Sequence, residues 1–223
     1  MRALLVGAGA REHIIAEKLS RTALLYSVMP APHPGISRLS EECLIHDPSD
    51  AAVVGEWARS RKIDVAFVSP DGLLAKGVTD TFADMGIPVA SPPKKAAQIE
   101  WDKGYARNLM LSHKIPGCPG LKIAKDLGEA RAALKELGMV AVKPLGLTGG
   151  KGVKIMREHL NSEEEAIAYC AALLEKDGCV LLEEKLEGEE FTLQAFCDGK
   201  SISLMPPVQD HKRAFEGDMG PNT

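Results

Sequence analysis

A glycine-rich stretch near the middle of the chain combines backbone freedom with positive charge. Lys143 ends the apolar run 139–142, and apolar residues resume at Val153. The residues between them include a second lysine and four glycines, namely Gly146, Gly149, Gly150, Lys151 and Gly152. Glycine lets backbone N–H groups approach an anion closely, and lysine adds positive charge. The pattern predicts a strand–loop–strand hairpin whose loop closes over the phosphates of a nucleotide, with a solvated hairpin tip as the alternative.

This stretch differs from a P-loop at one position. Gly152 follows Lys151, whereas a P-loop has Ser or Thr after its lysine. A further lysine, Lys103, stands at the start of a helix predicted over 102–113, where its charge opposes the helix dipole. A bound anion would account for that placement, and a solvated surface lysine is the alternative.

A second glycine-containing turn follows the first predicted strand. The run Gly7-Ala8-Gly9 leads into a helix predicted over 10–21, whose N-terminus, with Arg11 and His13, is a candidate anion site. A tight turn without a ligand is the alternative. A dinucleotide-binding turn is disfavoured, because Glu12 occupies its third glycine position and no acidic residue ends the second strand.

The elements that must hold these residues alternate between strand and helix over the first hundred positions. This alternation predicts an α/β fold with a doubly wound parallel sheet and helices on its faces. The loops at 30–35 and 69–72 follow strand ends, where such a sheet binds ligands, and simple turns are the alternative. The predicted strands are 3–6, 24–29, 44–45, 65–68 and 87–90, and the predicted helices are 10–21, 51–61 and 73–85.

The second half has a different pattern, in which the glycine-rich hairpin lies between helices. A small α+β unit that follows linker helices in this way can act as a lid. The predicted helices are 94–100, 102–113, 127–137 and 161–175. The predicted strands flank the glycine-rich loop or lie at 122–124, 180–182, 191–197 and 201–204.

Composition is ordinary for a globular protein and excludes several classes of partner. The chain has 223 residues, 45% hydrophobic and 26% charged, and its net charge of -4 gives no reason to expect nucleic acid or a membrane surface as a partner. It contains no apolar run long enough to span a bilayer and no signal-peptide pattern. Five cysteines without a Cys-x-x-Cys pair favour free thiols in a reducing cytosol over the alternatives of disulfides or a zinc site. We therefore expect a cytoplasmic protein.

Several motifs resemble those of the ATP-grasp superfamily. A lysine before a strand pair and a glycine-rich hairpin are followed by the runs Glu183-Glu184-Lys185-Leu186 and Gly188-Glu189-Glu190. The resemblance is closest to the glycinamide ribonucleotide synthetase (phosphoribosylamine–glycine ligase) family, and it extends from residue 1 to 223, so the chain looks like the N-terminal part of such an enzyme. The runs that carry this closer resemblance are 7–13, 92–100, 209–213 and 217–223.

The resemblance implies four regions along the chain. Residues 1–93 would form a Rossmann-like pre-ATP-grasp domain, and 94–118 would form linker helices. Residues 119–186 would form the ATP-grasp lid subdomain. Residues 187–223 would begin the ATP-grasp core and the substrate domain. The chain departs from the family at Ala10, where glycine is usual, and at Ser69-Pro70-Asp71-Gly72, where Gly-Pro-Glu-Ala is usual.

The resemblance also implies roles for individual residues. Lys143 and Arg213 would be catalytic, the backbone around Glu183 would meet the adenine edge, and Glu190 would accept hydrogen bonds from the ribose hydroxyls. The implied ATP-binding residues are Lys103, Lys143, Gly149, Gly150, Lys151, Gly152, Glu183, Glu184, Lys185, Leu186 and Glu190. The implied substrate-binding residues are Gly9, Arg11, Glu12, His13, Asp210, His211, Lys212, Arg213, Asp218, Pro221, Asn222 and Thr223.

The implied reaction is the ATP-dependent ligation of glycine to 5-phosphoribosylamine through a glycyl phosphate, a step of purine biosynthesis. ATP and Mg²⁺ or Mn²⁺ are the implied cofactors, and the metal ligands are expected in a C-terminal part, so none is assigned here. The chain is expected to be a truncated form with little activity alone, and a C-terminal complementing chain would be its partner. The alternatives are another ATP-grasp carboxylate–amine ligase and a nucleotide-binding fragment without catalysis.

Overall fold

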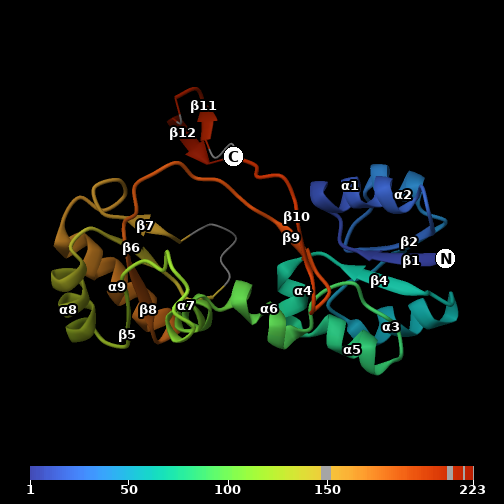
Figure 1. The fold of residues 1–223 in the computed structure, drawn as a ribbon, viewed down its shortest axis with the longest axis horizontal. Coiled ribbons are helices and arrows are strands. Elements are labelled where there is room, and N and C mark those ends of the chain that lie inside the picture. The colour runs from blue at the N-terminus through green and yellow to red at the C-terminus, as the bar shows by residue number, and fades with distance from the viewer. Residues whose placement is uncertain (147–151, 210–212, 218, 223) are drawn as a thin grey trace. The chain divides into compact units, whose positions relative to one another are not determined.

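The computed structural model describes residues 1–146, 152–209, 213–217 and 219–222 and divides into two units, Met1–Glu184 and Lys185–Thr223. It is an α/β structure with one parallel sheet and several antiparallel ones, as the sequence predicts (Figure 1). Eight candidate site residues lie outside the described residues: Gly149, Gly150, Lys151, Asp210, His211, Lys212, Asp218 and Thr223.

The first sheet contains four parallel strands in the order β3-β2-β1-β4. The order reverses direction at β1, which confirms the doubly wound topology. The strands are β1 (Arg2–Val6), β2 (Leu24–Met29), β3 (Glu42–Ile45) and β4 (Val65–Val68). The helices between and after them are α1 (Ala10–Leu19), α2 (Pro34–Leu39), α3 (Ala51–Ser60), α4 (Asp71–Lys76) and α5 (Val78–Asp84).

Alternating side chains of β1 divide the core of this region between the two faces of the sheet. Leu5 packs with Ala16 of α1 and Ile36 of α2. Leu4 packs in a separate cluster with Phe82 of α5. Because successive side chains of a strand point to opposite faces, α1 and α2 cover one face and α3 and α5 the other (Figure 1).

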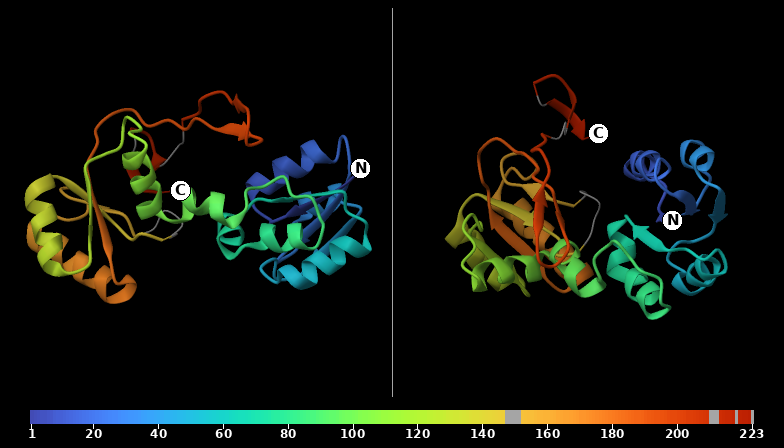
Figure 2. Two further views of the ribbon diagram at one scale, coloured as in Figure 1. Left: turned by 60° about the horizontal axis from the view of Figure 1, so that its bottom comes forward. Right: turned by 45° about the vertical axis from the view of Figure 1, so that its right-hand side comes forward.

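The second sheet has four strands in the order β5-β8-β6-β7, and every pairing in it is antiparallel. The pairing of β6 with β7 confirms the predicted hairpin on either side of the glycine-rich stretch. Helices α8 and α9 pack against one face of this sheet through apolar side chains (Figure 2). The strands are β5 (Leu121–Ala124), β6 (Val140–Lys143), β7 (Lys154–Ile155) and β8 (Val180–Glu184), and the helices are α6 (Lys94–Trp101), α7 (Lys103–Ser112), α8 (Leu127–Leu137) and α9 (Glu163–Asp177).

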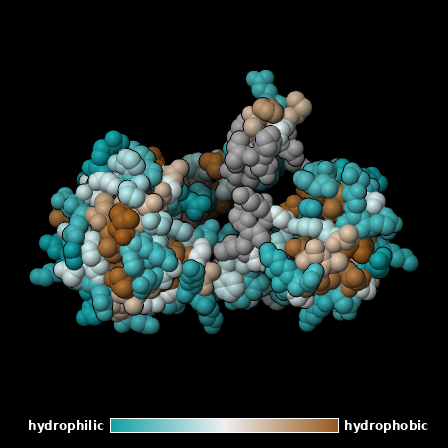
Figure 3. Space-filling view, turned by 180° about the vertical axis from the view of Figure 1, so that it is seen from behind, coloured by the Kyte–Doolittle hydropathy of each residue, from teal (hydrophilic) through white to brown (hydrophobic). Residues whose placement is uncertain are grey.

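The second unit consists of two short antiparallel strand pairs. Strand β9 (Ala195–Cys197) pairs with β10 (Ile202–Leu204), and β11 (Arg213–Phe215) pairs with β12 (Met219–Asn222). The predicted strand at 191–197 is therefore shorter than expected. Large apolar side chains are exposed throughout this unit: Phe191, Leu193, Phe196, Ile202, Leu204, Met205, Val208, Phe215 and Met219. On the face that Figure 3 shows, separate apolar patches lie among mainly hydrophilic residues.

Three predictions for the first region were wrong in detail. The helix predicted over 73–85 is two helices, because Gly77 has φ +81° and ends α4 in the left-handed region. The strand predicted over 87–90 forms only one bridge, between Val89 and Ala66. The loop predicted over 30–35 contains the start of α2, since His33 accepts a hydrogen bond from Ile36 N at 3.2 Å as an N-cap.

The break at Gly77 leads to a prediction about stability. We expect Gly77→Ala to lower the free energy of unfolding by about 1 kcal/mol, because an L side chain disfavours the left-handed backbone. A Cβ there would make only an ordinary contact, 3.5 Å from Lys94 Cδ, so backbone strain alone causes the loss. Urea denaturation measures this change.

Gly72→Ala is the matched control. Gly72 lies in the first turn of α4, and a Cβ there would have no atom within 4 Å. We expect no loss, or a gain of about 0.5–1 kcal/mol from better helix propensity. Equal losses in both variants would contradict the assignment of strain to Gly77.

Candidate phosphate-binding site

The ends of β6 and β8 place two candidate residues on one face of the second sheet. In their antiparallel pairing Glu183 stands opposite Ala141, and Lys143 lies two residues further along β6. Side chains two residues apart share a face, so Lys143 and Glu183 project together. The neighbouring residues Val142 and Leu182 point to the other face, into the core beneath α8 and α9.

Helix α7 brings two more charged residues to this face. Asp102 caps the helix by accepting from Tyr105 N at 2.9 Å, which fixes its start at Lys103. Arg107 lies one turn further on, at the i,i+4 position that shares a helix face with Lys103. The helix comes close to the sheet at Gly104, where a Cβ would lie only 3.0 Å from Leu145 Cδ2. We infer that the small residue permits this approach.

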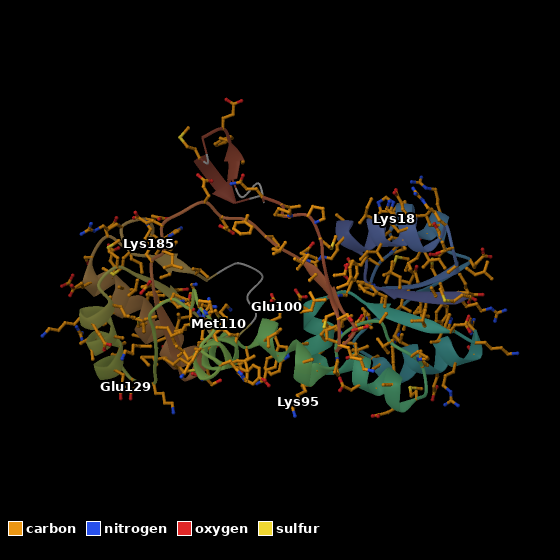
Figure 4. All side chains as sticks on the ribbon, viewed as in Figure 1. Lys18, Lys95, Glu100, Met110, Glu129 and Lys185 are labelled. Atoms are coloured by element: carbon orange, nitrogen blue, oxygen red, sulfur yellow. The ribbon has the colours of Figure 1, made fainter. Side chains whose placement is uncertain are left out.

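The buried carboxylate of Glu183 is the centre of the resulting cluster. Only 3% of its side chain is exposed, and each of its oxygens accepts from a different cation. Oε1 accepts from Arg107 Nε at 2.5 Å, and Oε2 accepts from Lys143 Nζ. Arg107 Nη1 also reaches Met110 Sδ at 3.5 Å, and Figure 4 labels Met110 on α7.

Lys103 is the third cation of this cluster and lies next to the loop that follows β6. Its Nζ donates to Gly146 O at 2.7 Å and to Leu145 O at 3.4 Å, immediately before the glycine-rich stretch. Burial lowers the pKa of Lys103, and the nearby positive charge of Lys143 lowers it further. The cluster therefore holds three cations around one anion, a combination that favours a further anionic ligand.

The pKa values within the cluster follow from this arrangement. Burial by itself raises the pKa of Glu183, but the hydrogen bonds from Arg107 and Lys143 outweigh it, so the pKa lies below its ordinary value. The hydrogen bond to Glu183 raises the pKa of Arg107. Glu183 is therefore a carboxylate, and Arg107 a cation, throughout the neutral range.

The sequence-predicted ATP-binding residues that the structure describes do not all lie together. Lys143 and Glu183 pair with each other, and Lys103 lies near enough to both for their charges to influence its pKa. Gly152 lies after the loop with φ +96°, and its carbonyl accepts from Tyr169 OH at 2.7 Å. Glu184 is exposed at the end of β8, and three further residues belong to the second unit: Lys185, Leu186 and Glu190.

Arg107 was not among the sequence-predicted site residues. Its partner Glu183 is 76 positions away along the chain, so no local motif links them. The one available signal was the i,i+4 spacing from Lys103 on the same helix. The prediction for Glu183 concerned its backbone, whereas in the structure its side chain makes the main contacts.

The N-terminal candidates meet at a separate place, the carboxyl edge of the parallel sheet. Glu12 is 6% exposed, accepts from Gly9 N at 2.5 Å, and also accepts from Ser69 Oγ. Its carboxylate thus ties the turn after β1 to the turn after β4. Arg11 is exposed, and it lines an open pocket of ≈ 510 Å³ together with Gly9, Ala10, Glu12, Pro70, Asp71 and Gly72.

His13 has a different environment from its neighbours. Its ring lies 5.0 Å from the ring of His33, at an interplanar angle of 50°. It also lies against the backbone of Gly35, where no Cβ would fit. The structure thus places His13 against α2. It is not among the residues that line the pocket, which include its neighbours Arg11 and Glu12.

The described backbone of the remaining candidates lies in β11 and β12. Arg213 pairs with Asn222 across the two strands, and Pro221 lies beside Asn222. Among the residues that the structure describes, no group of three His, Cys, Asp or Glu side chains could hold a metal ion. None of the helices in this described part combines the length and the hydropathy needed to cross a bilayer.

Comparison with known proteins identifies the family. The model for the N domain of phosphoribosylglycinamide synthetase matches residues 1–100, and the model for the ATP-grasp (A) domain of the same enzyme matches 101–223. The chain belongs to the phosphoribosylglycinamide synthetase family. The two matches together cover every residue of the chain, which confirms the resemblance read from its motifs.

Curated relatives of this family are about twice as long as the chain. The phosphoribosylamine–glycine ligase of Methanosarcina acetivorans is 48% identical over all of this chain and 51% of its own length. The enzyme of the same name from Thermococcus kodakarensis is 45% identical, over all of this chain and 52% of its own length. The chain thus spans about half the length of these relatives.

Solved structures agree with the family in their fold. The phosphoribosylamine–glycine ligase of Thermotoga maritima superposes with a TM-score of 0.79 at 24% identity, over all of this chain and 54% of that one. The N5-carboxyaminoimidazole synthetase of Staphylococcus aureus superposes with a TM-score of 0.72 at 14% identity, over 92% of this chain and 53% of that one. At such identities the likeness concerns the fold alone.

The lowered pKa of Glu183 predicts how stability depends on pH. We expect Glu183→Gln to lower the free energy of unfolding at pH 7 by about 2–3 kcal/mol, because two charge-assisted hydrogen bonds weaken. A depressed carboxyl pKa contributes stability above the ordinary value of about 4.3, and this stability is lost as pH falls through the folded-state pKa. The difference between the two proteins should therefore shrink below about pH 4. Urea denaturation at pH 7, 5, 4 and 3 measures it.

Glu42→Gln is the control for this measurement. Glu42 also pairs with an arginine, Arg61, but 45% of its side chain is exposed. We expect a smaller change, since solvent screens an exposed pair. A difference between Glu183→Gln and the unaltered chain that stays constant from pH 7 to pH 3 would contradict the assigned role of the Glu183 carboxylate.

Proposed function

We propose that this chain supplies the nucleotide site of an ATP-dependent ligase that joins glycine to 5-phosphoribosylamine. The products would be glycinamide ribonucleotide, ADP and phosphate. The observation that carries the proposal is the cluster of Lys103, Arg107 and Lys143 around the buried Glu183, at the start of the glycine-rich stretch. Membership of the family supports the choice of reaction.

The chemistry fits the residue types in the cluster. A carboxylate is a poor electrophile at neutral pH, so glycine must be activated before an amine can attack it. Transfer of the γ-phosphate of ATP to glycine gives an acyl phosphate, and the amine of phosphoribosylamine then displaces phosphate. Such transfer depends on positioning and charge neutralisation, which lysines can supply without a protein nucleophile.

Individual roles follow as part of the proposal. Lys143 and Arg213 act on the reacting groups, and Lys103 and Lys143 hold the phosphates. The remaining ATP contacts are assigned to Gly149, Gly150, Lys151, Gly152, Glu183, Glu184, Lys185, Leu186 and Glu190. The contacts to glycine and phosphoribosylamine are assigned to Gly9, Arg11, His13, Asp210, His211, Lys212, Arg213, Asp218, Pro221, Asn222 and Thr223, and Glu12 is assigned a supporting role in the same site.

The structure constrains two of these assignments. The Glu12 carboxylate already accepts hydrogen bonds from Gly9 N and Ser69 Oγ. We therefore assign it the role of shaping the pocket rather than of contacting the ligand. The described residues offer no ligand set for Mg²⁺ or Mn²⁺, and no step of the proposal is assigned to a metal within them. A C-terminal part, on the same or a second chain, is the proposed source of metal ligands.

The proposal extends to the organisation of the chain and its location. We assign 1–93 to the pre-ATP-grasp domain, 94–118 to linker helices, 119–186 to the lid and 187–223 to the start of the core. A reducing cytoplasm suits the five cysteines, all of which are free.

An activity assay tests the proposed reaction. ADP release is measured with ATP, glycine and phosphoribosylamine, for the 223-residue chain alone and together with the C-terminal half of the Methanosarcina acetivorans relative. We expect ADP release that requires all three substrates when both parts are present, and little with the chain alone. ADP release that is independent of glycine would contradict the proposed reaction.

The role of Lys143 gives a separate prediction. We expect Lys143→Met to weaken ATP binding about 10- to 100-fold, because a charge-assisted hydrogen bond contributes about 1.5–3 kcal/mol. Calorimetric titration of ATP into each protein measures the change.

Lys122→Met is the matched control for Lys143→Met. Lys122 lies on β5 of the same sheet, but its side chain is 46% exposed and pairs with Glu136 at 2.9 Å. We expect its removal to leave ATP affinity unchanged. Unchanged affinity in Lys143→Met would remove this residue from the site.

A further inference from the structure

Arg107 occupies a position that the proposed function leaves unexplained. Its guanidinium is held on Glu183 Oε1, and its side chain is 29% exposed. Lys143 holds the other oxygen of the same carboxylate, and its side chain is 23% exposed. Both cations thus share one buried anion, although a single cation would already form an ion pair with it.

Lys143 has two competing partners if it binds phosphate. It must leave or weaken its hydrogen bond to Glu183 when it donates to a phosphate oxygen. A buried carboxylate left without a counterion is strongly destabilised, because it has lost both water and its partner. If Lys143 were the sole counterion of Glu183, it would therefore stay paired with Glu183 instead of binding phosphate.

Arg107 removes this conflict. Its hydrogen bond to Oε1 does not involve the oxygen that Lys143 uses. When Lys143 turns toward a phosphate, Glu183 keeps a charged partner and remains neutralised. The planar guanidinium is suited to such a permanent pairing, whereas the flexible ammonium of lysine can exchange between partners.

We propose that Arg107 is a positioning residue that makes Lys143 available to nucleotide phosphates by acting as the permanent counterion of Glu183. This inference rests on the proposed nucleotide site but adds a residue to it that touches neither phosphate nor adenine. Its effect passes through Glu183. The effect of removing Arg107 should consequently depend on the charge at position 183.

A double-mutant cycle tests this dependence. ADP with Mg²⁺ is titrated calorimetrically into the unaltered chain, Arg107→Met, Glu183→Gln and the double variant. We expect Arg107→Met to weaken ADP binding about tenfold when Glu183 is present. With the neutral Glu183→Gln, which needs no counterion, the same substitution should change affinity by less than about threefold.

Two outcomes of the cycle would overturn the inference. Equal losses with Glu183 and with Glu183→Gln would mean that Arg107 acts on the nucleotide directly or only on the fold. No loss in either would mean that Lys143 is available without Arg107. Folding of each variant is checked by circular dichroism, and Arg107→Gln, which keeps N–H donors without charge, replaces Arg107→Met if that variant does not fold.

A measurement without nucleotide separates this inference from the proposed function. Trace labelling with acetic anhydride, read by mass spectrometry, compares the reactivity of Lys143 with that of Lys122 in the same protein. In Arg107→Met, Lys143 becomes the sole counterion of Glu183, so its relative reactivity should fall severalfold. An unchanged or increased reactivity would overturn the inference, whereas failure of the unaltered chain to bind ADP would instead overturn the proposed function.

Discussion

The arrangement of the second sheet depends on satisfying one buried carboxylate. Glu183 lies at the end of β8 with almost no exposed surface, and a charge in such a place must be paired. Its partners come from two other elements, Arg107 from α7 and Lys143 from β6. The same pairing therefore holds a helix against one face of the sheet and concentrates positive charge next to a glycine-rich stretch. One set of contacts thus accounts for the pairing of a buried charge and for the local excess of positive charge.

A second buried carboxylate plays a comparable part in the N-terminal region, with different partners. Glu12 accepts from a backbone N–H and from the hydroxyl of Ser69, so it joins two turns without a paired cation in those contacts. The two carboxylates therefore differ in the charge of the groups that donate to them. At Glu12 the carboxylate shapes the rim of a pocket, whereas at Glu183 it gathers cations whose charge exceeds its own.

Sequence patterns predicted the elements well wherever local signals determined them. The alternation of apolar strand segments with helices predicted the parallel sheet, and the glycines after Lys143 predicted the hairpin. The helix over 73–85 failed because apolar spacing continues through Gly77, while the backbone there turns left-handed. At 87–90 the residues favour a strand, but the single bridge of Val89 to Ala66 depends on tertiary packing.

The site was predictable only in part, because some of its contacts also depend on tertiary packing. Lys103 and Lys143 each stand beside a recognisable local feature, a helix start and a strand end. Arg107 meets Glu183 only when α7 is folded against the sheet, where a Cβ at Gly104 would crowd Leu145 and Ile123. The proposed exchange of Lys143 between Glu183 and a ligand would likewise be a property of the assembled cluster, with no signature along the chain.

A crystal structure of the chain with ADP and Mg²⁺ tests the central claim most directly. We expect phosphate oxygens within about 2.7–3.2 Å of the Nζ atoms of Lys103 and Lys143, with Arg107 still paired to Glu183. Phosphates bound instead at the N-terminus of α1 beside Arg11, with Lys143 still on Glu183, would contradict it.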